Sequence, residues 1–278
     1  SLFGLKEFGN IYSRLGNPTV GALEARLTDL EEGAMCVALS SGTSAVMYSL
    51  INIMSQGDNF VTANQLYGGT YTMFDNILPE YGIDSKKVDI TDLKAVEGAI
   101  DDKTRAIYCE TITNPGLVVA DVTALSEIAH SRGIPLIVDA TFTTSAIQKS
   151  FEFGADIVVY SLTKWMSGHG RVIAGAVIEK GGFDWGNGNF PLYDKPDTSY
   201  GGMRWGHDLG DLSSVAYSLR LRTVPLRNLG ANMSPETAFE VMSGLETLGL
   251  RMDRHCENAI KAAEYLSDHE LVEWIRYP

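Results

Sequence analysis

Several features that define other classes of protein are missing from this 278-residue sequence. The three cysteines, Cys36, Cys109 and Cys256, lie far apart and form neither a CxxC pair nor a disulfide framework. No apolar run approaches the roughly 20 residues that a membrane span needs. The first residues lack the basic segment and apolar stretch of a secretory signal. We therefore expect a cytoplasmic protein with no membrane partner.

Positive charge is also scarce. Lysine and arginine number 22 against 35 aspartate and glutamate residues, which gives a formal net charge of -13. Such a surface repels a phosphodiester backbone, so we expect no nucleic-acid partner. Histidines 130, 207, 255 and 269 have no metal-ligand spacing, and no metal is predicted. The fingerprints GxGxxG and GxxxxGK[ST] of dinucleotide and nucleoside-triphosphate sites are absent too.

Alternating strand and helix patterns dominate the middle of the chain. Apolar runs such as 136–138 and 157–159 are typical of strands that are covered on both faces. Strands are predicted at 37–40, 59–63, 105–111, 135–141, 156–163 and 173–180, and helices at 44–54, 70–81, 91–99 and 121–132. This alternation predicts an α/β fold with a mostly parallel mixed sheet sandwiched by helices.

The two ends of the chain differ from this middle. An amphipathic helix that starts near Pro18 precedes the first strand. The segment 181–212 is rich in Gly, Asp, Asn and Pro and is predicted to wrap irregularly over the surface. Ser234, Pro235 and Glu236 are helix-start signals, and one long helix is expected to follow to about Ser267.

Lys164 carries the most informative chemistry. An apolar strand runs directly into Ser161, Leu162, Thr163 and Lys164. A lysine there would be partly desolvated, which favours the neutral amine that forms a Schiff base. Ser161 and Thr163 could both donate to a phosphate. Taken alone, this pattern is more often a surface lysine at the end of a strand.

Asp139 closes another apolar strand and places a carboxylate at the edge of the sheet where α/β proteins bind ligands. A buried carboxylate needs a cationic partner, and a protonated pyridine nitrogen is one. Capping of the next helix is an equally good interpretation of Asp139 alone.

Three further strand ends point to the same edge. Gly42 and Thr43 begin a helix directly after a strand, where free N–H groups favour an anion such as phosphate. Tyr67 lies among glycines after the next strand, where its ring could stack on an aromatic ligand, and Asn114 follows a third. Each has a plain structural alternative, a loop that binds nothing or a surface tyrosine.

Five ordered motifs resemble the cystathionine γ-synthase-type enzymes of cysteine and methionine metabolism, which depend on pyridoxal 5'-phosphate (PLP). They are IYSRLGNPT (11–19), LYGGT (66–70), IVDATF (137–142), SLTKWMSGHG (161–170) and GLETL (244–248). Within that family the chain is most similar to O-acetylhomoserine sulfhydrylases. The resemblance implies a fold-type I, aspartate aminotransferase-like large domain.

The resemblance also implies roles for single residues. Lys164 would form the Schiff base and move protons, and Asp139 would pair with the pyridine nitrogen. Tyr67 would stack on the ring and be the second catalytic residue beside Lys164. Asn114 would contact the 3'-oxygen, and Thr141 would support the ring face. Phosphate would be held by Gly42, Thr43, Ser161 and Thr163, and by Tyr12 and Arg14 from a neighbouring subunit, which implies a homodimer and favours a homotetramer.

The domains expected on this basis are an N-terminal arm and first helix (1–35) that reach the neighbouring subunit, a PLP-binding domain (36–232), and a long helix (233–278). That helix would lead into a C-terminal domain, carrying the arginine for the substrate carboxylate, that is largely outside the given chain. We therefore expect the chain to be a fragment. His169 is expected to be part of a structural turn rather than catalytic.

The implied reaction is γ-replacement on O-acetyl-L-homoserine by sulfide, giving homocysteine and acetate in methionine biosynthesis. Gly69 stands where methionine γ-lyases have cysteine, which argues against that activity. Cystathionine γ-synthase or another γ-lyase remains an alternative. A non-catalytic α/β module that binds a ligand at the same edge is an alternative from another class.

Overall fold

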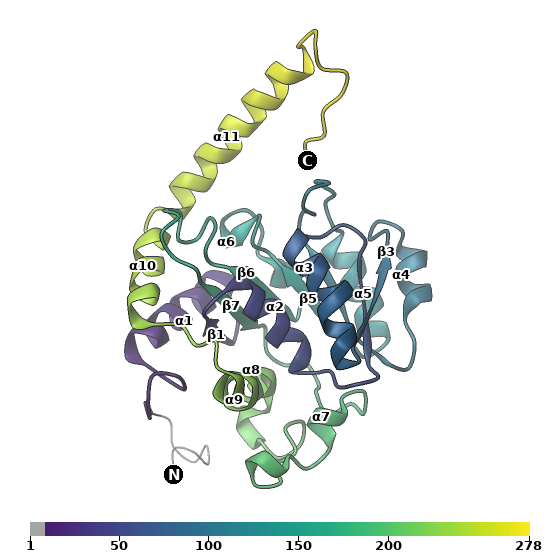
Figure 1. Cartoon of the computed structure of the whole chain (residues 1–278), viewed down its shortest axis with the longest axis vertical. Coiled ribbons are helices and arrows are strands. Elements are labelled where there is room, and N and C mark those ends of the chain that lie inside the picture. Colours follow the sequence, from purple (N-terminus) through teal and green to yellow (C-terminus); the bar gives the residue numbers. More distant parts are fainter. Residues whose placement is uncertain (1–8) are drawn as a thin grey trace.

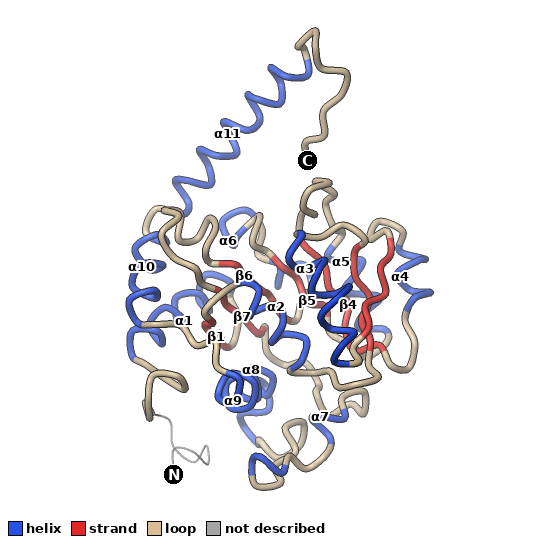
Figure 2. Tube along the Cα trace, viewed as in Figure 1, coloured by secondary structure: helices blue, strands red, loops and turns tan. Residues whose placement is uncertain are grey.

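A computed structural model describes residues 9–278 and shows a central sheet covered by helices (Figure 1, Figure 2). The N-terminal arm predicted over 1–35 therefore lies partly outside the described residues. Seven strands form the sheet in the order β1-β7-β6-β5-β4-β2-β3. The strands are β1 (Met35–Leu39), β2 (Asn59–Ala63), β3 (Asp84–Val88), β4 (Thr104–Glu110), β5 (Leu136–Asp139), β6 (Ile157–Ser161) and β7 (Gly175–Glu179).

Strand direction determines which strand ends lie at the same edge of the sheet. Neighbours from β6 through β5, β4 and β2 to β3 are parallel, whereas β7 is antiparallel to both β6 and β1. All strands except β7 therefore end at one edge of the sheet. This confirms the predicted α/β fold with a mostly parallel mixed sheet, and every predicted strand is present to within a few residues.

Helices cover the sheet and bury its apolar strands. Helix α1 (Pro18–Glu31) packs on β1, α2 (Gly42–Ile51) on β6 and β7, and α5 (Val122–Ser131) on β4 and β5. Strands β2 and β4 are buried along their whole length, as expected for strands that are covered on both faces. Further α-helices before residue 230 are α3 (Gly68–Thr72), α4 (Leu93–Ala99), α6 (Thr144–Ile147), α7 (Pro191–Asp194), α8 (Ala216–Leu221) and α9 (Arg227–Leu229).

The C-terminal segment forms two helices rather than the single one expected. Ser234 caps α10 (Pro235–Leu245) by accepting a hydrogen bond from Thr237 N, as the sequence predicts. The chain then turns at Glu246 and Thr247 into α11 (Leu248–Ser267), which projects from the body of the molecule. The domain boundaries expected for this end of the chain remain predictions.

The segment 181–212 is irregular, but it is not a mere surface wrap. Trp185, Phe190, Tyr193 and Trp205 are almost fully buried. The indole of Trp185 stacks on Tyr193, with ring centroids 5.0 Å apart. Burial of such large rings offsets the lack of regular structure, so this part of the prediction was wrong.

Candidate active site

The predicted site residues follow the ends of five strands at one edge of the sheet. Gly42 and Thr43 follow β1, Tyr67 follows β2, Asn114 follows β4, Asp139 and Thr141 come from β5, and Ser161, Thr163 and Lys164 come from β6. Ligands of open α/β sheets bind at the carboxyl edge of the strands. The order of the strands thus brings segments that are over 100 residues apart to one place.

Helix α2 begins against the end of β6. A Cβ atom on Gly42 would lie 2.5 Å from Ser161 Cβ, so only glycine allows this approach. Ser41 Oγ caps the helix by accepting a hydrogen bond from Ser44 N at 3.0 Å. Within residues 9–278, no acceptor is bonded to the N–H groups of Gly42 and Thr43. They are orphan donors at a helix N-terminus, which suits an anion.

Thr141 joins β5 to the same place. Its hydroxyl accepts a hydrogen bond from Ser161 N at 2.8 Å, and its own N–H donates to Asp139 Oδ1 at 2.9 Å. Gly42, Ser161, Thr141 and Asp139 are therefore joined by direct contacts. Thr163 differs, because its hydroxyl donates to Ala174 O at 3.2 Å and accepts from Ala174 N at 3.0 Å.

Asp139 is a deeply set carboxylate with a small accessible part at the edge of the sheet. Burial raises its pKa, while the bond from Thr141 and a 3.3 Å bond from the Tyr108 hydroxyl act in the opposite direction. Within the described part of the chain Asp139 forms no ion pair. A positively charged nitrogen is the partner that such a carboxylate lacks.

Glu110 belongs to this site and was not identified from the sequence. It ends β4 beside Asp139, its Cα partner on β5, and it is 6% exposed. Burial, followed by the negative charge of Asp139, raises the pKa of Glu110 to about 7. The available signal was the same one that identified Asp139, an acidic residue that closes an apolar strand.

Tyr67 and Asn114 are held through Glu110. Tyr67 N donates to Glu110 Oε1 at 2.7 Å, and Asn114 N donates to Glu110 Oε2 at 3.0 Å. The Tyr67 side chain is 48% exposed, and its ring lies over Gly69, where a Cβ would approach Tyr67 Cε1 to 2.8 Å. A face of the ring thus remains accessible for stacking.

Lys164 lies in the turn after β6, and in the single chain it is exposed. The partial desolvation expected from the sequence is therefore wrong for the residues described. The reason is local, since β6 ends at Ser161 and Lys164 lies three residues beyond it. His169 Nδ1 hydrogen-bonds to Ser167 O at 2.6 Å in the same turn, as expected for a structural residue.

The start of α11 clamps this lysine-bearing turn. Arg251 Nη1 donates to Trp165 O at 2.7 Å, and Arg251 Nη2 donates to Gly244 O at 2.8 Å. The Trp165 ring packs on His255, with centroids 4.7 Å apart. The sequence does not reveal this clamp, because its parts lie more than 80 residues apart.

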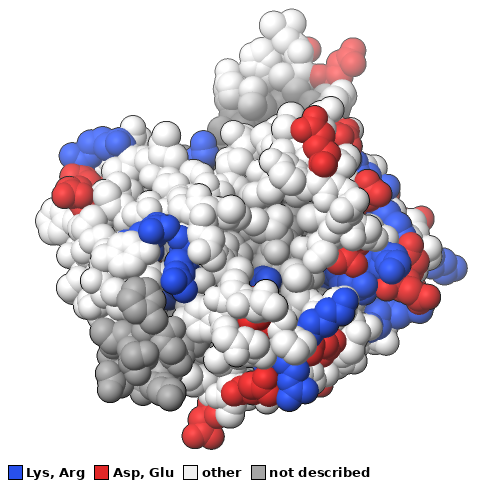
Figure 3. Space-filling view, turned by 60° about the horizontal axis from the view of Figure 1, so that its bottom comes forward, with Lys and Arg blue, Asp and Glu red and all other residues white. Residues whose placement is uncertain are grey.

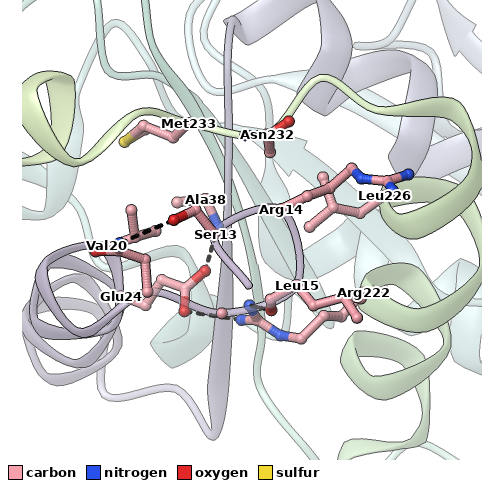
Figure 4. Close-up of a pocket in the computed structure, with 12 residues that line it drawn as sticks. Ser13, Arg14, Leu15, Val20, Glu24, Ala38, Arg222, Leu226, Asn232 and Met233 are labelled. Atoms are coloured by element: carbon pink, nitrogen blue, oxygen red, sulfur yellow. Dashed lines mark hydrogen bonds and ion pairs between the residues drawn. The ribbon is translucent and has the colours of Figure 1, made fainter. Parts of the chain in front are cut away.

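Tyr12 and Arg14 contact the outer part of their own chain. The Arg14 guanidinium lies 5.1 Å from the centroid of the Tyr12 ring and donates to Arg227 O. Figure 4 shows Arg14 close to a small hollow of about 10 Å³ beside the half-buried Glu24–Arg222 ion pair. This hollow is a packing space near α1 and holds none of the other predicted site residues. The role of Tyr12 and Arg14 across a subunit boundary stays a prediction.

The arrangement fits a ligand with a cationic ring nitrogen at one end and a phosphate at the other. Asp139 offers an unpaired carboxylate, the N-terminus of α2 offers free N–H groups, and Lys164 offers a primary amine on the same edge. These are the groups that PLP requires.

Other kinds of site find less support. Among residues 9–278 no cluster of three or more His, Cys, Asp or Glu side chains could hold a metal ion. Nor does any helix in that range have the length and apolar character needed to cross a membrane. On the face in Figure 3, basic and acidic side chains are interspersed rather than gathered into one basic surface.

Proteins of similar sequence lead to the same conclusion as the geometry of the site. The chain is 44% identical to O-acetyl-L-homoserine sulfhydrylase of Leptospira meyeri and 44% identical to homocysteine synthase of Schizosaccharomyces pombe, in each case over 100% of its length. It covers 64% and 65% of those two proteins, so it spans just under two thirds of their length.

Solved structures agree at the level of the fold. A protein provisionally assigned as an O-acetylhomoserine (thiol)-lyase from Campylobacter jejuni superimposes with a TM-score of 0.95 at 38% identity, and the match covers 100% of this chain and 67% of that one. That structure carries N'-pyridoxyl-lysine-5'-monophosphate. Cystathionine γ-lyase from Lactobacillus plantarum gives a TM-score of 0.77 at 33% identity, covering 96% of this chain and 61% of that one.

A family model described as "Cys/Met metabolism PLP-dependent enzyme" matches residues 1–278. Because this match extends over the whole chain, the protein belongs to the Cys/Met metabolism PLP-dependent enzyme family.

Proposed function

We propose that this chain provides the cofactor-binding part of an enzyme that converts O-acetyl-L-homoserine and sulfide into L-homocysteine and acetate. The observation that carries this proposal is the continuous set of contacts from Gly42 through Ser161 and Thr141 to Asp139. These contacts place groups suited to a phosphate at one end and a carboxylate suited to a pyridinium at the other. The names of the relatives, O-acetyl-L-homoserine sulfhydrylase and homocysteine synthase, select this reaction within the family.

In this proposal each residue acts on a defined part of the cofactor. Gly42 N, Thr43 N and Ser161 Oγ would bind its phosphate, Asp139 would bind the protonated ring nitrogen, and Lys164 Nζ would attach to its carbonyl carbon with loss of water. Thr163 can join the phosphate contacts only if its hydroxyl turns away from Ala174 O. Tyr67 stacks on the ring, and Asn114 contacts the 3'-oxygen.

Bound PLP withdraws electrons from the α-carbon of an amino-acid substrate. Lys164 Nζ, freed when the substrate attaches, is the base that takes the proton from Cα and returns protons during the reaction. Asp139 keeps the ring nitrogen protonated, because a carboxylate beside it favours the cation. With the cofactor bound, Lys164 Nζ would also remove a proton from Cβ, acetate would leave from Cγ with its bonding electrons, and sulfide would add at Cγ while the protons return to the carbon chain.

We further propose that two copies of the chain share each site, with Tyr12 and Arg14 contacting the phosphate bound by the neighbouring copy. The planar guanidinium of Arg14 suits two phosphate oxygens at once. The exposure of Lys164 and of Tyr67 in a single chain is compatible with cover by a partner subunit.

The full-length protein can be tested by its products. We expect homocysteine from O-acetyl-L-homoserine with sulfide, little cystathionine when cysteine replaces sulfide, and little 2-oxoacid when no nucleophile is present. Cystathionine as the main product would instead support the cystathionine γ-synthase alternative. Asp139→Ala should weaken PLP binding and slow loss of the α-proton, and kinetics within about twofold of the wild type would rule out its assigned role.

A further inference from the structure

Glu110 connects two loops of the candidate site through a single carboxylate. Its Oε1 accepts a hydrogen bond from Tyr67 N at 2.7 Å, in the loop after β2. Its Oε2 accepts one from Asn114 N at 3.0 Å, in the loop after β4. At 6% exposure the side chain is shielded from water, which would otherwise compete for both bonds.

The ionised form of this side chain makes both bonds best. A carboxylate offers two charged acceptor oxygens, whereas a protonated acid keeps one good acceptor and one weak one, and an amide presents donor hydrogens on one side. Because both partners are backbone N–H groups, loss of the charge leaves Tyr67 N or Asn114 N with a weak acceptor or none. A part-buried amide that loses its acceptor costs free energy, so one of the two loops would move to regain a partner.

We propose that Glu110 is a positioning residue for the cofactor, which as a carboxylate holds Tyr67 and Asn114 in place to contact the ring. The proposal rests on the proposed function, because Tyr67 and Asn114 are assigned to the cofactor there. Glu110 itself touches neither cofactor nor substrate in this account and acts through the two backbone amides.

The surroundings of Glu110 make its charge sensitive to what binds next to it. It faces the Asp139 carboxylate on β5, Tyr108 and Cys109 on its own strand, and the loop that bears Tyr67. On its other side, the residues of β2, Asn59–Ala63, carry no ionisable group. On the Asn114 loop, the Arg276 guanidinium donates to Gly116 O at 2.9 Å.

These neighbours link the ionisation of Glu110 to occupation of the site. Burial and the charge of Asp139 raise the pKa of Glu110 to about 7, so near neutral pH both of its forms are populated. A cationic ring nitrogen at Asp139 removes the repulsion and favours the carboxylate of Glu110. By linkage, PLP affinity should rise as pH increases through about 7, because the Glu110 carboxylate is the form that favours binding.

The test uses Glu110→Gln in the full-length protein, with Glu179→Gln as its matched control. Glu179 is also buried, also has a pKa raised to about 7, and also accepts from two N–H groups, those of Trp185 Nε1 and Ser218. It lies at the opposite edge of the sheet, since it pairs with Ile157 at the start of β6. PLP affinity is measured by absorbance titration from pH 6 to pH 8.5 for the wild type and both variants.

We expect Glu110→Gln to weaken PLP binding at pH 8 by roughly tenfold or more, as for loss of a hydrogen bond to a charged group. The rise in affinity between pH 6 and pH 8 should also be smaller in Glu110→Gln, while Glu179→Gln follows the wild type. Equal affinity and equal pH dependence in Glu110→Gln and the wild type would overturn the proposal.

A second measurement needs no substitution. In the wild-type protein without PLP, hydrogen exchange at Tyr67 N and Asn114 N, corrected for the intrinsic rates, should be better protected at pH 8 than at pH 6. Unchanged protection at both amides would also refute the role of Glu110. If the wild-type protein binds no PLP at all, the proposed function fails instead, so the two failures are distinguishable.

Discussion

Gly42 approaches Ser161 so closely that a Cβ atom on residue 42 would lie 2.5 Å from the Cβ of Ser161. This contact brings the free N–H groups of α2 to the end of β6, where Lys164 follows. The phosphate end of the candidate site therefore requires a glycine, which has no side chain, at position 42.

Gly42→Ala should force α2 away from β6 and weaken PLP binding by about tenfold or more, because the amides at the helix N-terminus lose their alignment. Gly21→Ala is the control, since a Cβ on Gly21 meets nothing within 4 Å inside α1. It should keep PLP affinity and gain up to about 1 kcal/mol of stability. Equal PLP affinity in the two variants would contradict the assignment of the phosphate site.

Arg251→Met removes the donors that bind the carbonyl oxygens of Trp165 and Gly244. We expect the free energy of unfolding to fall by about 1–3 kcal/mol and hydrogen exchange to increase in the Lys164 turn. Arg254→Met is the matched control on the same helix, because Arg254 is 71% exposed and pairs only with Glu257 among the ion pairs described. If both variants unfold at the same urea concentration, the clamp does not stabilise the turn.

The sequence was sufficient for the parts of the fold and site that local patterns encode. Strands β5 and β6 contain continuous apolar runs, Asp139 ends the first of them, and Lys164 lies three residues beyond the second. Strand β3 was missed, because its sequence DSKKV is polar and lies at the edge of the sheet with every residue at least partly accessible. An edge strand needs no such apolar run, so hydrophobic pattern cannot reveal it.

Contacts between distant segments could not be predicted in the same way. The hydrogen bonds of Glu110 to two amides in different loops could not be predicted, because the order of the strands decides that these segments meet. The 181–212 segment was assigned to the surface because its glycines suggest loops, whereas its aromatic side chains fill the core. Lys164 was expected to be desolvated because the strand was predicted to extend to Thr163, whereas β6 ends at Ser161.

Glu31 gives the protein a pH-dependent stability away from the site. Its side chain is 1% exposed, and burial raises its pKa from an ordinary value of 4.5 to about 7. The folded state thus binds the proton more tightly than the unfolded state. This contribution to stability is fully present below about pH 4.5 and is lost as pH rises through about 7.

Glu31→Gln should therefore reduce the loss of unfolding free energy between pH 5 and pH 8 by on the order of 2 kcal/mol. Urea unfolding at the two pH values, without PLP, measures this change. Glu246→Gln serves as the control, since Glu246 is 64% exposed and pairs with Arg26 at the surface. If the free energy of unfolding changes with pH in Glu31→Gln as much as in the wild type, Glu31 does not titrate as described.

Arg14→Ala should lower PLP affinity even in a correctly folded dimer if the arm completes the site of the partner. Mixing this variant with Lys164→Ala should then restore activity, because a heterodimer can assemble one site with both wild-type residues. Native mass spectrometry confirms that subunits have exchanged. Exchange without recovered activity would refute the shared site.

The central claim is that Lys164 carries the cofactor, and one measurement tests it most directly. The purified full-length protein is saturated with PLP, reduced with borohydride, digested and analysed by mass spectrometry, with Lys164→Ala treated in parallel. We predict a pyridoxyl group on the peptide that contains Lys164 and none in the variant, because a Schiff base is reduced where it forms. Stoichiometric labelling of another lysine, or no labelling of the wild type, would contradict the account.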